Sequence, residues 1–562
     1  AKSCLHTFPV RQRSRANVGT VSVSEEEQHY GSSLLRQVEL AAGGVSENNR
    51  RRRLGRLICG AVERCGLAAG GQDGKANCTD HECAVPEGPN CCQTLHMGDG
   101  VYNSVRMDQP GVVDAIIIGA GAAGLAAASE LRANGRSVVV IEARSRVGGR
   151  IFTYRDPLVP VPIELGAEFL HGATPNTDTI IGRAGLTAVD VVGDNWRARD
   201  GYFRKVDYWK KVDKVLRKLD EHRMPDRSLS DHLAERAARK KKSKDVKARS
   251  LALEFVQGFH AADASLVSER WLARGGDPGE SPEEARTGRI LDGYDRVPAW
   301  LVRDVFDAVE LNTVVTNVEW ERGNATVTCR DSEQFLRIFE ARTVIVTVPV
   351  GVLKAPAGED GAIAFTPEVP GMIEAMNGLE MGSALRTIFA FSERIWEKGL
   401  PHAPQKDGGL TSLGFMHSPG AKFPVWWTQF PVRVPLLVGW VGGPAAGELC
   451  TLSNIEIERL ALHDLARHLG TTYECLAGVV RGSWMHNWER DPFSRGAYSY
   501  AAVGGSGAAR KLARPVEQTI FFAGEATDTD GHSGTVEGAL ATGSRAARGV
   551  LLALGVESLS NQ

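Results

Sequence analysis

The sequence lacks both a long hydrophobic run and a surplus of charge of either sign. Its uninterrupted apolar stretches fall short of the ~20 residues that a helix needs to span a bilayer. It carries 66 Lys and Arg against 68 Asp and Glu, so no overall basic excess attracts nucleic acid or an anionic membrane surface. We therefore expect neither a nucleic acid nor a membrane as a partner.

Cysteine is scarce in most of the chain. Of the ten cysteines, only Cys329, Cys450 and Cys475 follow residue 92, which is typical of a reduced intracellular protein and predicts a cytoplasmic location. The cysteines near His81 match no standard zinc spacing, so we predict no metal site. Residues 1–110 are polar with little periodicity, and we expect them to form a leader of low order.

Ordered patterns begin at Val112. The stretch "VVDAIIIGAGAAGLAAASEL" passes from an apolar strand through a glycine turn into an Ala-rich helix, and "SVVVIEA" is a second buried strand. Further strand patterns follow at Leu311–Trp320, Thr343–Leu353 and Thr519–Gly524, and a closing helix at about Thr535–Leu552. One nucleotide-binding domain interrupted by a second domain explains this order better than two consecutive domains.

The predicted domain boundaries follow from this pattern. We expect the cofactor domain in three parts, residues 111–205, 286–355 and 481–556. The substrate domain is expected in two parts, a helical one at 206–285 and a mixed sheet at 356–480. The 562 residues and their 43% hydrophobic content are sufficient for cores of this size.

A dinucleotide-binding motif lies at the first turn. Gly119, Gly121 and Gly124 form G-x-G-x-x-G, with Ala122 and Ala123 between them. The glycines allow a tight turn, a close approach to a pyrophosphate and close packing of helix on strand. Glu142 closes the second strand, where its carboxylate can accept both ribose hydroxyls of an adenosine and would repel a 2′-phosphate.

A second glycine run follows that carboxylate. Arg146, Gly148, Gly149 and Arg150 form R-x-G-G-R, and "ELGAEFLHG" supplies further small residues. Glycines let the backbone pass close to a ligand, and an arginine can neutralise a pyrophosphate. NAD proteins rarely need this second run. FAD is longer, so the run indicates FAD and disfavours an NAD dehydrogenase.

With these motifs, residues Val112–Val556 resemble the flavin-dependent amine oxidases, the group of polyamine oxidases, monoamine oxidases and lysine-specific histone demethylases. The matching segments are "VIVTVPVGVL", "TVVTNV", "DPFSRGAYSY", "FFAGEAT" and "SGTVEGALATG". The resemblance implies an α/β fold: a Rossmann-type FAD-binding domain of the GR2 flavoprotein kind, interrupted by an α+β substrate-binding domain.

The resemblance also implies which residues bind FAD. Val315 would meet the adenine through its backbone, and Glu525 would bind ribityl hydroxyls. Ala497 replaces the cysteine that bonds the flavin in monoamine oxidases, so FAD should be non-covalent. The other residues expected along the cofactor are Ala143, Arg144, Gly149, Arg150, Gly166, Ala167, Glu168, Trp488, Gly524, Thr535 and Val536.

Four residues are expected at the substrate. The family pattern places Tyr498 and Thr535 on either side of the amine, so that only one wall is aromatic, and it places His171 facing the substrate. Thr535 can equally cap the closing helix. Arg386 aligns with the lysine that holds a water at flavin N5, which puts normal oxygen reactivity in question. Glu537 replaces a histidine usual in the family.

The expected activity is oxidation of an amine to an imine by hydride transfer to flavin N5, with O2 as acceptor and H2O2 and an aldehyde as products. The residues of the GAYSY and FAGEAT motifs favour polyamine-like substrates over aryl monoamines. Two alternatives remain open: an L-amino acid oxidase that recruits Arg386 for the substrate carboxylate, and a non-catalytic FAD-binding scaffold. The sequence predicts no oligomeric state.

Overall fold

The computed structural model describes residues 105–106, 111–206, 208–239, 243–275, 287–397, 400, 402 and 409–555. Nearly all of the predicted leader, residues 1–110, lies outside the described residues. Within the described part of the chain, no helix combines the length and the apolar character needed to cross a membrane.

A parallel sheet built from distant chain segments forms the centre of the first domain. Its strands β3 (Val138–Ile141), β2 (Val113–Ile118), β14 (Leu336–Val346) and β23 (Ile520–Phe522) are parallel, and β2 lies between β3 and β14. Their apolar residues are buried on both faces, as expected for parallel strands covered on each side. Two short strands, β1 (Val105–Arg106) and β11 (Val309–Glu310), pair with β14 and β3.

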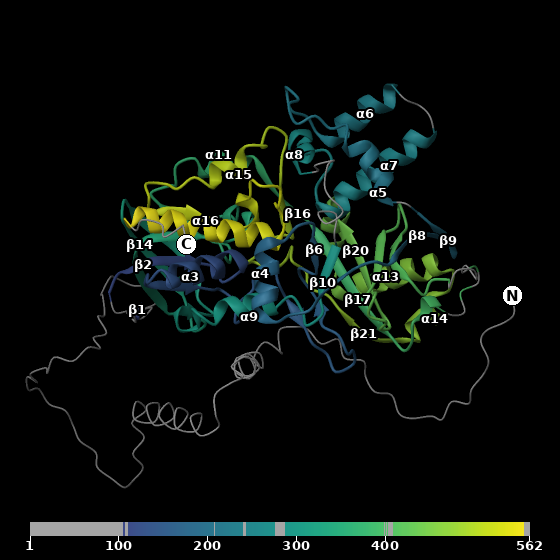
Figure 1. Cartoon of the computed structure of the whole chain (residues 1–562), viewed down its shortest axis with the longest axis horizontal. Coiled ribbons are helices and arrows are strands. Elements are labelled where there is room, and N and C mark those ends of the chain that lie inside the picture. The colour runs from purple at the N-terminus through teal and green to yellow at the C-terminus, as the bar shows by residue number, and fades with distance from the viewer. Residues whose placement is uncertain are drawn as a thin grey trace, which may run out of the picture. The chain divides into compact units, whose positions relative to one another are not determined.

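Two helices cover one face of this sheet, as Figure 1 shows: α3 (Ala122–Ala133) and α16 (Val536–Ala553) lie side by side. Small residues allow the close approach. A Cβ atom built on Gly543 of α16 would lie 2.2 Å from the carbonyl oxygen of Ala123 in α3. The predicted closing helix is confirmed, and Thr535 is its N-cap.

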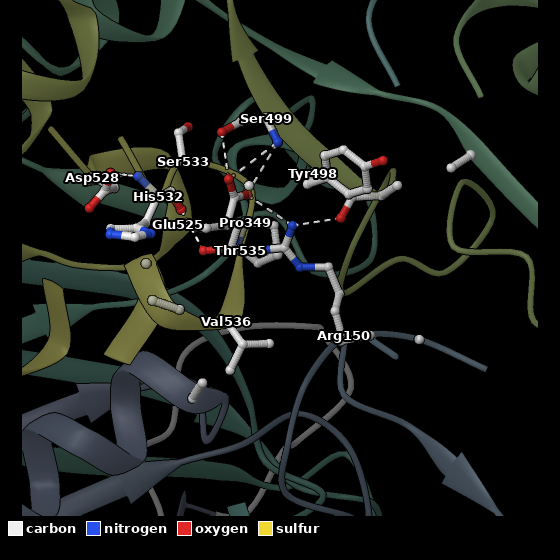
Figure 2. A pocket seen from close by; sticks show the side chains of 18 of the residues that line it. Arg150, Pro349, Tyr498, Ser499, Glu525, Asp528, His532, Ser533, Thr535 and Val536 are labelled. Atoms are coloured by element: carbon white, nitrogen blue, oxygen red, sulfur yellow. Dashed lines mark hydrogen bonds and ion pairs between the residues drawn. The ribbon is translucent and has the colours of Figure 1, made fainter. Parts of the chain in front are cut away.

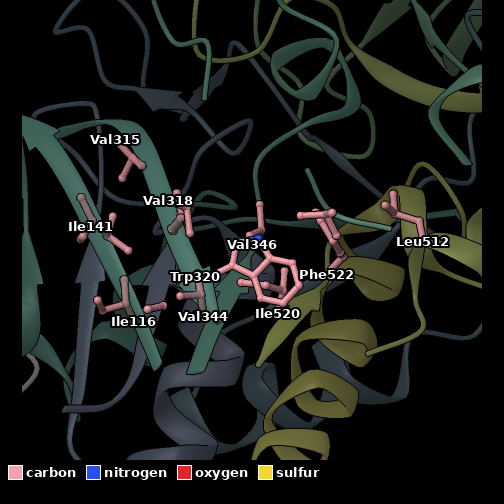
Figure 3. Close-up of a cluster of buried hydrophobic side chains, with 14 of the residues drawn as sticks. Ile116, Ile141, Val315, Val318, Trp320, Val344, Val346, Leu512, Ile520 and Phe522 are labelled. Atoms are coloured by element: carbon pink, nitrogen blue, oxygen red, sulfur yellow. The ribbon is translucent and has the colours of Figure 1, made fainter. Parts of the chain in front are cut away.

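The opposite face carries an antiparallel extension of the same sheet. Strand β13 (Asn324–Arg330) pairs with the first half of β14, and β12 (Val314–Glu321) pairs with β13. Alternate residues of β12 and β13 are buried in a core with the sheet (Figure 3), in which Trp320 belongs to the same cluster as Ile520 and Phe522. Helices α11 (Met372–Asn377) and α15 (Ala508–Leu512) pack against this core.

The second domain contains a seven-stranded sheet. Its order is β21 (Val480–Trp484), β17 (Ala384–Phe391), β20 (Leu436–Gly442), β19 (Val425–Thr428), β18 (Leu413–His417), β8 (Asp194–Arg199) and β9 (Tyr202–Lys205). One face packs on α12 (Pro444–Cys450), α13 (Asn454–Leu469) and α14 (Tyr473–Ala477), and its core includes Trp426 and Phe423. The helical part contains α5 (Tyr208–Leu216), α6 (Leu229–Arg239), α7 (Ser243–Phe259) and α8 (Glu269–Arg274).

Short elements connect the two sheets. A three-stranded sheet has the order β6 (Phe169–His171), β10 (Thr287–Ile290) and β7 (Ala188–Asp190), and α4 (Pro175–Ala184) and α9 (Arg296–Val302) lie beside α3 or α16. Two strand pairs, β4 (Thr153–Tyr154) with β5 (Ile163–Glu164) and β16 (Leu379–Gly382) with β22 (Tyr498–Ala501), stand apart. The remaining described elements are α10 (Val350–Leu353), β15 (Ala364–Thr366) and three single turns, Phe306–Ala308, Ile395–Glu397 and Glu525–Thr527.

The predicted α/β fold with an interrupted cofactor domain is confirmed. Sheet membership nevertheless departs from the expected ranges in several places. Strand β21 lies mostly in the range 481–556 but pairs with β17 of the seven-stranded sheet, and β16, in the range 356–480, pairs with β22. Strands β8 and β9 fall in the range 111–205 but belong to the seven-stranded sheet, and β15 falls in 356–480 but pairs with β12. Strand periodicity indicates that a segment is extended, whereas the strand with which it pairs is determined by contacts distant in sequence. The domain ranges stay a prediction.

The contact between α3 and α16 leads to a stability prediction. We expect Gly543→Ala to lower the free energy of unfolding by about 1–3 kcal/mol or more, because the added methyl group meets the backbone of the facing helix. Gly182→Ala in α4 is the matched control, since a Cβ there meets nothing within 4 Å, and should stabilise by about 0.5–1 kcal/mol. Equal effects of both substitutions in chemical denaturation would contradict the close packing.

Candidate active site

A cavity of about 1380 Å3 extends from the first glycine turn to the second domain. Every residue predicted to bind the cofactor or substrate lines it, with the exception of Gly124. Figure 2 shows the part where Arg150, Tyr498, Glu525 and Thr535 lie together. The cavity is larger than the roughly 300–1,000 Å3 typical of drug-sized ligands, so it has room for a dinucleotide and a second molecule.

The first glycine turn has the geometry of a phosphate cradle. A Cβ on Gly121 would meet no protein atom within 4 Å, so the backbone at this point is open to the cavity. Gly119 has φ +102°, and a Cβ on Gly124 would lie 1.9 Å from the carbonyl oxygen of Gly119. Gly124 therefore packs helix against turn instead of touching a ligand. The N-terminus of α3 has no side-chain cap and can face an anion.

Glu142 lies at the end of β3, buried beside this turn. Its carboxylate accepts hydrogen bonds from the backbone N–H groups of Ala120 at 2.8 Å and Arg144 at 3.0 Å. These bonds fix the carboxylate where the cavity passes the strand end. Val315 lines the same part, because Thr313 N–H donates to the Glu142 carbonyl oxygen at 2.9 Å.

The second glycine run lies directly against the first. Gly148 forms an isolated parallel bridge with Gly121, and its N–H donates to the carbonyl oxygen of Ala120 at 2.8 Å. Gly148 and Gly149 have φ of +102° and +59°, a region that favours glycine. A Cβ on Gly166 would lie 1.9 Å from the carbonyl oxygen of Arg150. The two runs thus form one continuous cradle.

Arg150 joins this cradle to the C-terminal part of the chain. Its Nη1 donates to the Glu525 carboxylate at 2.9 Å and to the carbonyl oxygen of Ala497 at 2.7 Å (Figure 2). Glu525 also accepts a hydrogen bond from the Ser499 hydroxyl at 2.7 Å. The structure therefore places Arg150 against a carboxylate and a carbonyl oxygen, whereas the sequence suggested a contact with the pyrophosphate.

Arg144 makes a second link between distant segments. Its Nη2 donates to Asp491 at 2.7 Å and to the Ser494 hydroxyl at 2.9 Å. Although burial opposes ionisation, hydrogen bonds from His486 and Arg144 and the positive charge of Arg144 lower the pKa of Asp491. Trp488, in the same segment, donates from its indole to the carbonyl oxygen of Leu165 at 2.9 Å and lines the cavity.

The predicted substrate-facing residues Tyr498, Thr535 and His171 line the same cavity. The Tyr498 hydroxyl donates to the carbonyl oxygen of Phe259 at 2.6 Å, which fixes the ring, and burial raises the pKa of Tyr498. Thr535 both lines the cavity and caps α16, accepting from Gly538 N–H at 3.1 Å. Burial lowers the pKa of His171 to about 4, so this side chain is neutral at pH 7.

Aromatic side chains form much of the wall between these residues and the second domain. Phe169, Phe415 and Trp427 contact one another with ring centroids 5.5–6.0 Å apart. Phe255 stacks on Phe259 at 5.0 Å, and Phe259 also meets His171 edge-on. Such faces can hold an amine without accepting a proton from it.

Arg386 and Glu168 occupy this wall in a way that the sequence did not predict. Arg386 Nη1 donates to the carbonyl oxygens of Glu164 at 2.6 Å and Gly166 at 2.8 Å, and its Nη2 lies 3.3 Å from the Glu168 carboxylate. Glu168 also pairs with Arg289 at 2.7 Å. The carboxylate expected at the cofactor is thus held between two guanidinium groups, although both Glu168 and Arg386 line the cavity.

The sequence patterns do not single out Arg289 or Glu164, and they assign no role to Glu537. Arg289 lies buried behind Glu168, and Glu164 lies buried against Thr153 and the N–H of Tyr294. Glu537 accepts four hydrogen bonds, at 2.6–3.0 Å, from the backbones and side chains of Asn176 and Thr177 at the start of α4. A charged residue inside an otherwise apolar stretch is the only local signal. In the part of the chain that the structure describes, no three His, Cys, Asp or Glu side chains are arranged to hold a metal ion.

Comparison with known proteins gives one family. The model of the family described as flavin containing amine oxidoreductase matches residues 122–551. Lysine-specific histone demethylase 1 homolog 3 of Arabidopsis thaliana is 29% identical over 511 residues, covering 77% of this chain but only 29% of that protein. Polyamine oxidase 3 of Oryza sativa subsp. japonica is 28% identical over 466 residues, covering 77% of this chain and 88% of that protein.

Solved structures of the same fold include two oxidases. Putrescine oxidase bound to putrescine superposes with a TM-score of 0.64 at 22% identity, covering 78% of this chain and 99% of that one. Cyclohexylamine oxidase from Brevibacterium oxydans IH-35A gives 0.64 at 20% identity, covering 79% and 100%. At this identity the likeness concerns the fold.

The open backbone at Gly121 predicts a variant that folds but does not bind cofactor. A valine at this position meets no protein atom at its Cβ and projects into the cradle. We expect Gly121→Val to keep its thermal unfolding transition without cofactor and to purify without flavin absorbance. A variant that stays yellow would contradict the cradle.

Burial of Glu164 predicts a pH-dependent stability. Burial raises the pKa of Glu164 from 4.5 to about 8, so the folded state binds more protons than the unfolded state between these values. The free energy of unfolding should therefore fall as the pH rises from about 5 to 8, by an amount on the order of a few kcal/mol. Glu164→Gln should flatten this slope in melting curves.

Glu456, in the capping box of α13, provides the control for that measurement. Hydrogen bonds from Ser453 lower the pKa of Glu456, so this residue is already ionised above pH 5. Glu456→Gln should lower the melting temperature equally at all these pH values. A wild-type slope that survives in Glu164→Gln would mean that Glu164 ionises normally.

Proposed function

The chain belongs to the flavin-containing amine oxidoreductase family, and we propose that it oxidises a polyamine or a related primary or secondary amine with non-covalently bound FAD and O2. The imine product would hydrolyse to an aldehyde and an amine or ammonia. The alanine at position 497 supports a non-covalent cofactor, because the cysteine of monoamine oxidases is replaced there.

One observation carries this proposal: residues of both glycine runs, Glu525, the start of α16 and Tyr498 all line the same cavity. A dinucleotide cradle alone would fit many oxidoreductases. Its continuation past Gly166 to Glu525 suits a longer cofactor, whose reactive ring Tyr498 and Thr535 would contact. A flavin bound there would supply the acceptor for the hydride from the carbon beside the amine, with O2 as the final electron acceptor.

The protein's own contribution is to bind the amine and to exclude water from it. The face of the Tyr498 ring and the aromatic wall can pack against it, and the fixed hydroxyl of Tyr498 is already engaged with Phe259. Desolvation in this wall favours the neutral amine, the form in which the nitrogen lone pair can assist loss of hydride. Neutral His171 adds no competing charge at pH 7.

Two acidic side chains of the helical part support a substrate with a second cationic group, although Arg217 lines the cavity beside them. Asp213 of α5 and Glu254 of α7 both line it. Asp213 lies 3.8 Å from Arg217, the residue that follows α5, whereas Glu254 accepts a hydrogen bond from Ser250 at 3.0 Å and its pKa is raised by burial. An approaching ammonium group would favour the ionised form of Glu254.

The two alternatives are less well supported. An L-amino acid oxidase needs a free guanidinium for the substrate carboxylate, but both terminal nitrogens of Arg386 already face protein oxygens. A non-catalytic scaffold would not need a fixed aromatic wall. Anaerobic mixing with spermidine, phenethylamine and an L-amino acid tests all three: bleaching mainly by spermidine supports the proposal, bleaching mainly by the amino acid overturns the substrate, and no bleaching overturns catalysis.

The role of Tyr498 leads to a further prediction. Tyr498→Ala should slow anaerobic flavin reduction by about 10- to 100-fold, because the amine loses its wall and its orientation, while the flavin absorbance stays. Tyr498→Phe is the control, since it keeps the ring and loses only the bond to Phe259, and it should retain most of the rate. Unchanged reduction in the alanine variant would remove Tyr498 from the site.

A further inference from the structure

The wall formed by Arg386, Glu168 and Arg289 carries an uncompensated positive charge. All three residues are at least nine-tenths buried, with exposed fractions of 8%, 4% and 5%. The Glu168 carboxylate accepts from Arg289 at 2.7 and 3.2 Å and from the indole of Trp427 at 3.2 Å, and it faces Arg386 at 3.3 Å. Two guanidinium groups thus share one carboxylate.

The nearby Glu164 does not cancel this surplus. Because burial raises its pKa to about 8, Glu164 is mostly protonated at pH 7. The two guanidinium groups lower the pKa of Glu168 despite its burial, so Glu168 contributes one negative charge. An unpaired charge in a buried position is costly unless a partner compensates it.

Arg386 also has a hydrogen-bond donor without a partner. Its Nη1 is used by the carbonyl oxygens of Glu164 and Gly166, and its Nη2 faces Glu168, but its buried Nε–H has no acceptor among the described residues. Arg386 lines the cavity, and its charge acts on the hydroxyl of Tyr498. An unsatisfied donor of this kind adds to the cost of keeping this guanidinium group buried.

We propose that this guanidinium pair stabilises the reduced, anionic form of the bound flavin and so raises its reduction potential. The inference rests on the proposed function for the flavin itself. Taking up two electrons and one proton leaves the flavin ring with one negative charge, which compensates the surplus charge of the wall. Arg289 does not line the cavity, so it is a positioning residue that acts through Glu168.

Variants with opposite charge effects test the proposal. The midpoint potential is measured by anaerobic reduction with xanthine and xanthine oxidase against a reference dye, without any amine. Arg289→Met removes one positive charge from a residue that does not line the cavity. It should lower the equilibrium constant for two-electron reduction about tenfold, which is a fall of about 30 mV in the midpoint potential. Glu168→Gln removes the negative charge and should shift the potential upward. Arg386→Lys should change the potential less than Arg386→Met.

Arg337→Met is the control, because Arg337 pairs with Glu310 at 2.9 Å and neither residue lines the cavity. Its potential should equal that of the wild type. Shifts of one sign in both Arg289→Met and Glu168→Gln would indicate loosened structure and overturn the proposal. The proposal would also be overturned if the potentials did not change and Arg386→Met lost the ability to bind benzoate. The positive charge would then bind a carboxylate ligand.

The wild-type protein gives an independent measurement if a variant does not fold. With an anionic reduced flavin, one proton accompanies two electrons, and the potential should fall by about 30 mV per pH unit between pH 5 and 7. A fall of about 60 mV per unit would mean a neutral reduced ring and overturn the proposal. Failure of the proposed function is distinguishable, since it would appear as protein without flavin absorbance or without bleaching by any amine.

Discussion

The ion pair between Arg150 and Glu525 joins segments that lie 375 positions apart in the chain. On one side it holds the second glycine run, and on the other the turn that precedes α16. Ser499 donates to the same carboxylate, so the strand that carries Tyr498 is fixed by this contact as well. The glycine cradle and the cavity wall beside Tyr498 therefore depend on one partly buried pair, and removal of either partner would leave the other charge uncompensated.

Backbone contacts around this pair leave little room for adjustment. Gly124, Gly166 and Gly543 each bring a Cα within reach of another segment's carbonyl oxygen, where a Cβ would lie at 1.9–2.2 Å. Gly121 differs, because its missing side chain leaves space for a ligand instead of for the protein. The same residue type thus serves packing at three positions and binding at a fourth.

The sequence predicted those features that local patterns encode. Apolar strands, the glycine turn and the N-terminus of the closing helix lie where their spacing placed them. The partners of Arg386 and Glu537 could not be predicted in this way, because they lie about 220 and 360 residues away in the chain. Alignment suggested that Arg386 stands where the family lysine holds a water at flavin N5. Only the folded chain shows that its terminal nitrogens contact Glu168 and two carbonyl oxygens.

Under the proposed function, the charges of the cavity are arranged to order an amine with two nitrogen atoms. The surplus of positive charge beside Arg386 repels an ammonium group and favours a neutral amine, and the aromatic wall excludes the water that would stabilise the protonated form. Glu254, on the helical part, would have the opposite effect on a distal ammonium group, because its carboxylate lines the cavity without an arginine partner as near as the one that Asp213 has in Arg217. A substrate held at both ends would therefore bind with its neutral nitrogen toward Tyr498. The charges alone would set this orientation, without a side chain in the wall that removes a proton from one of the two nitrogens.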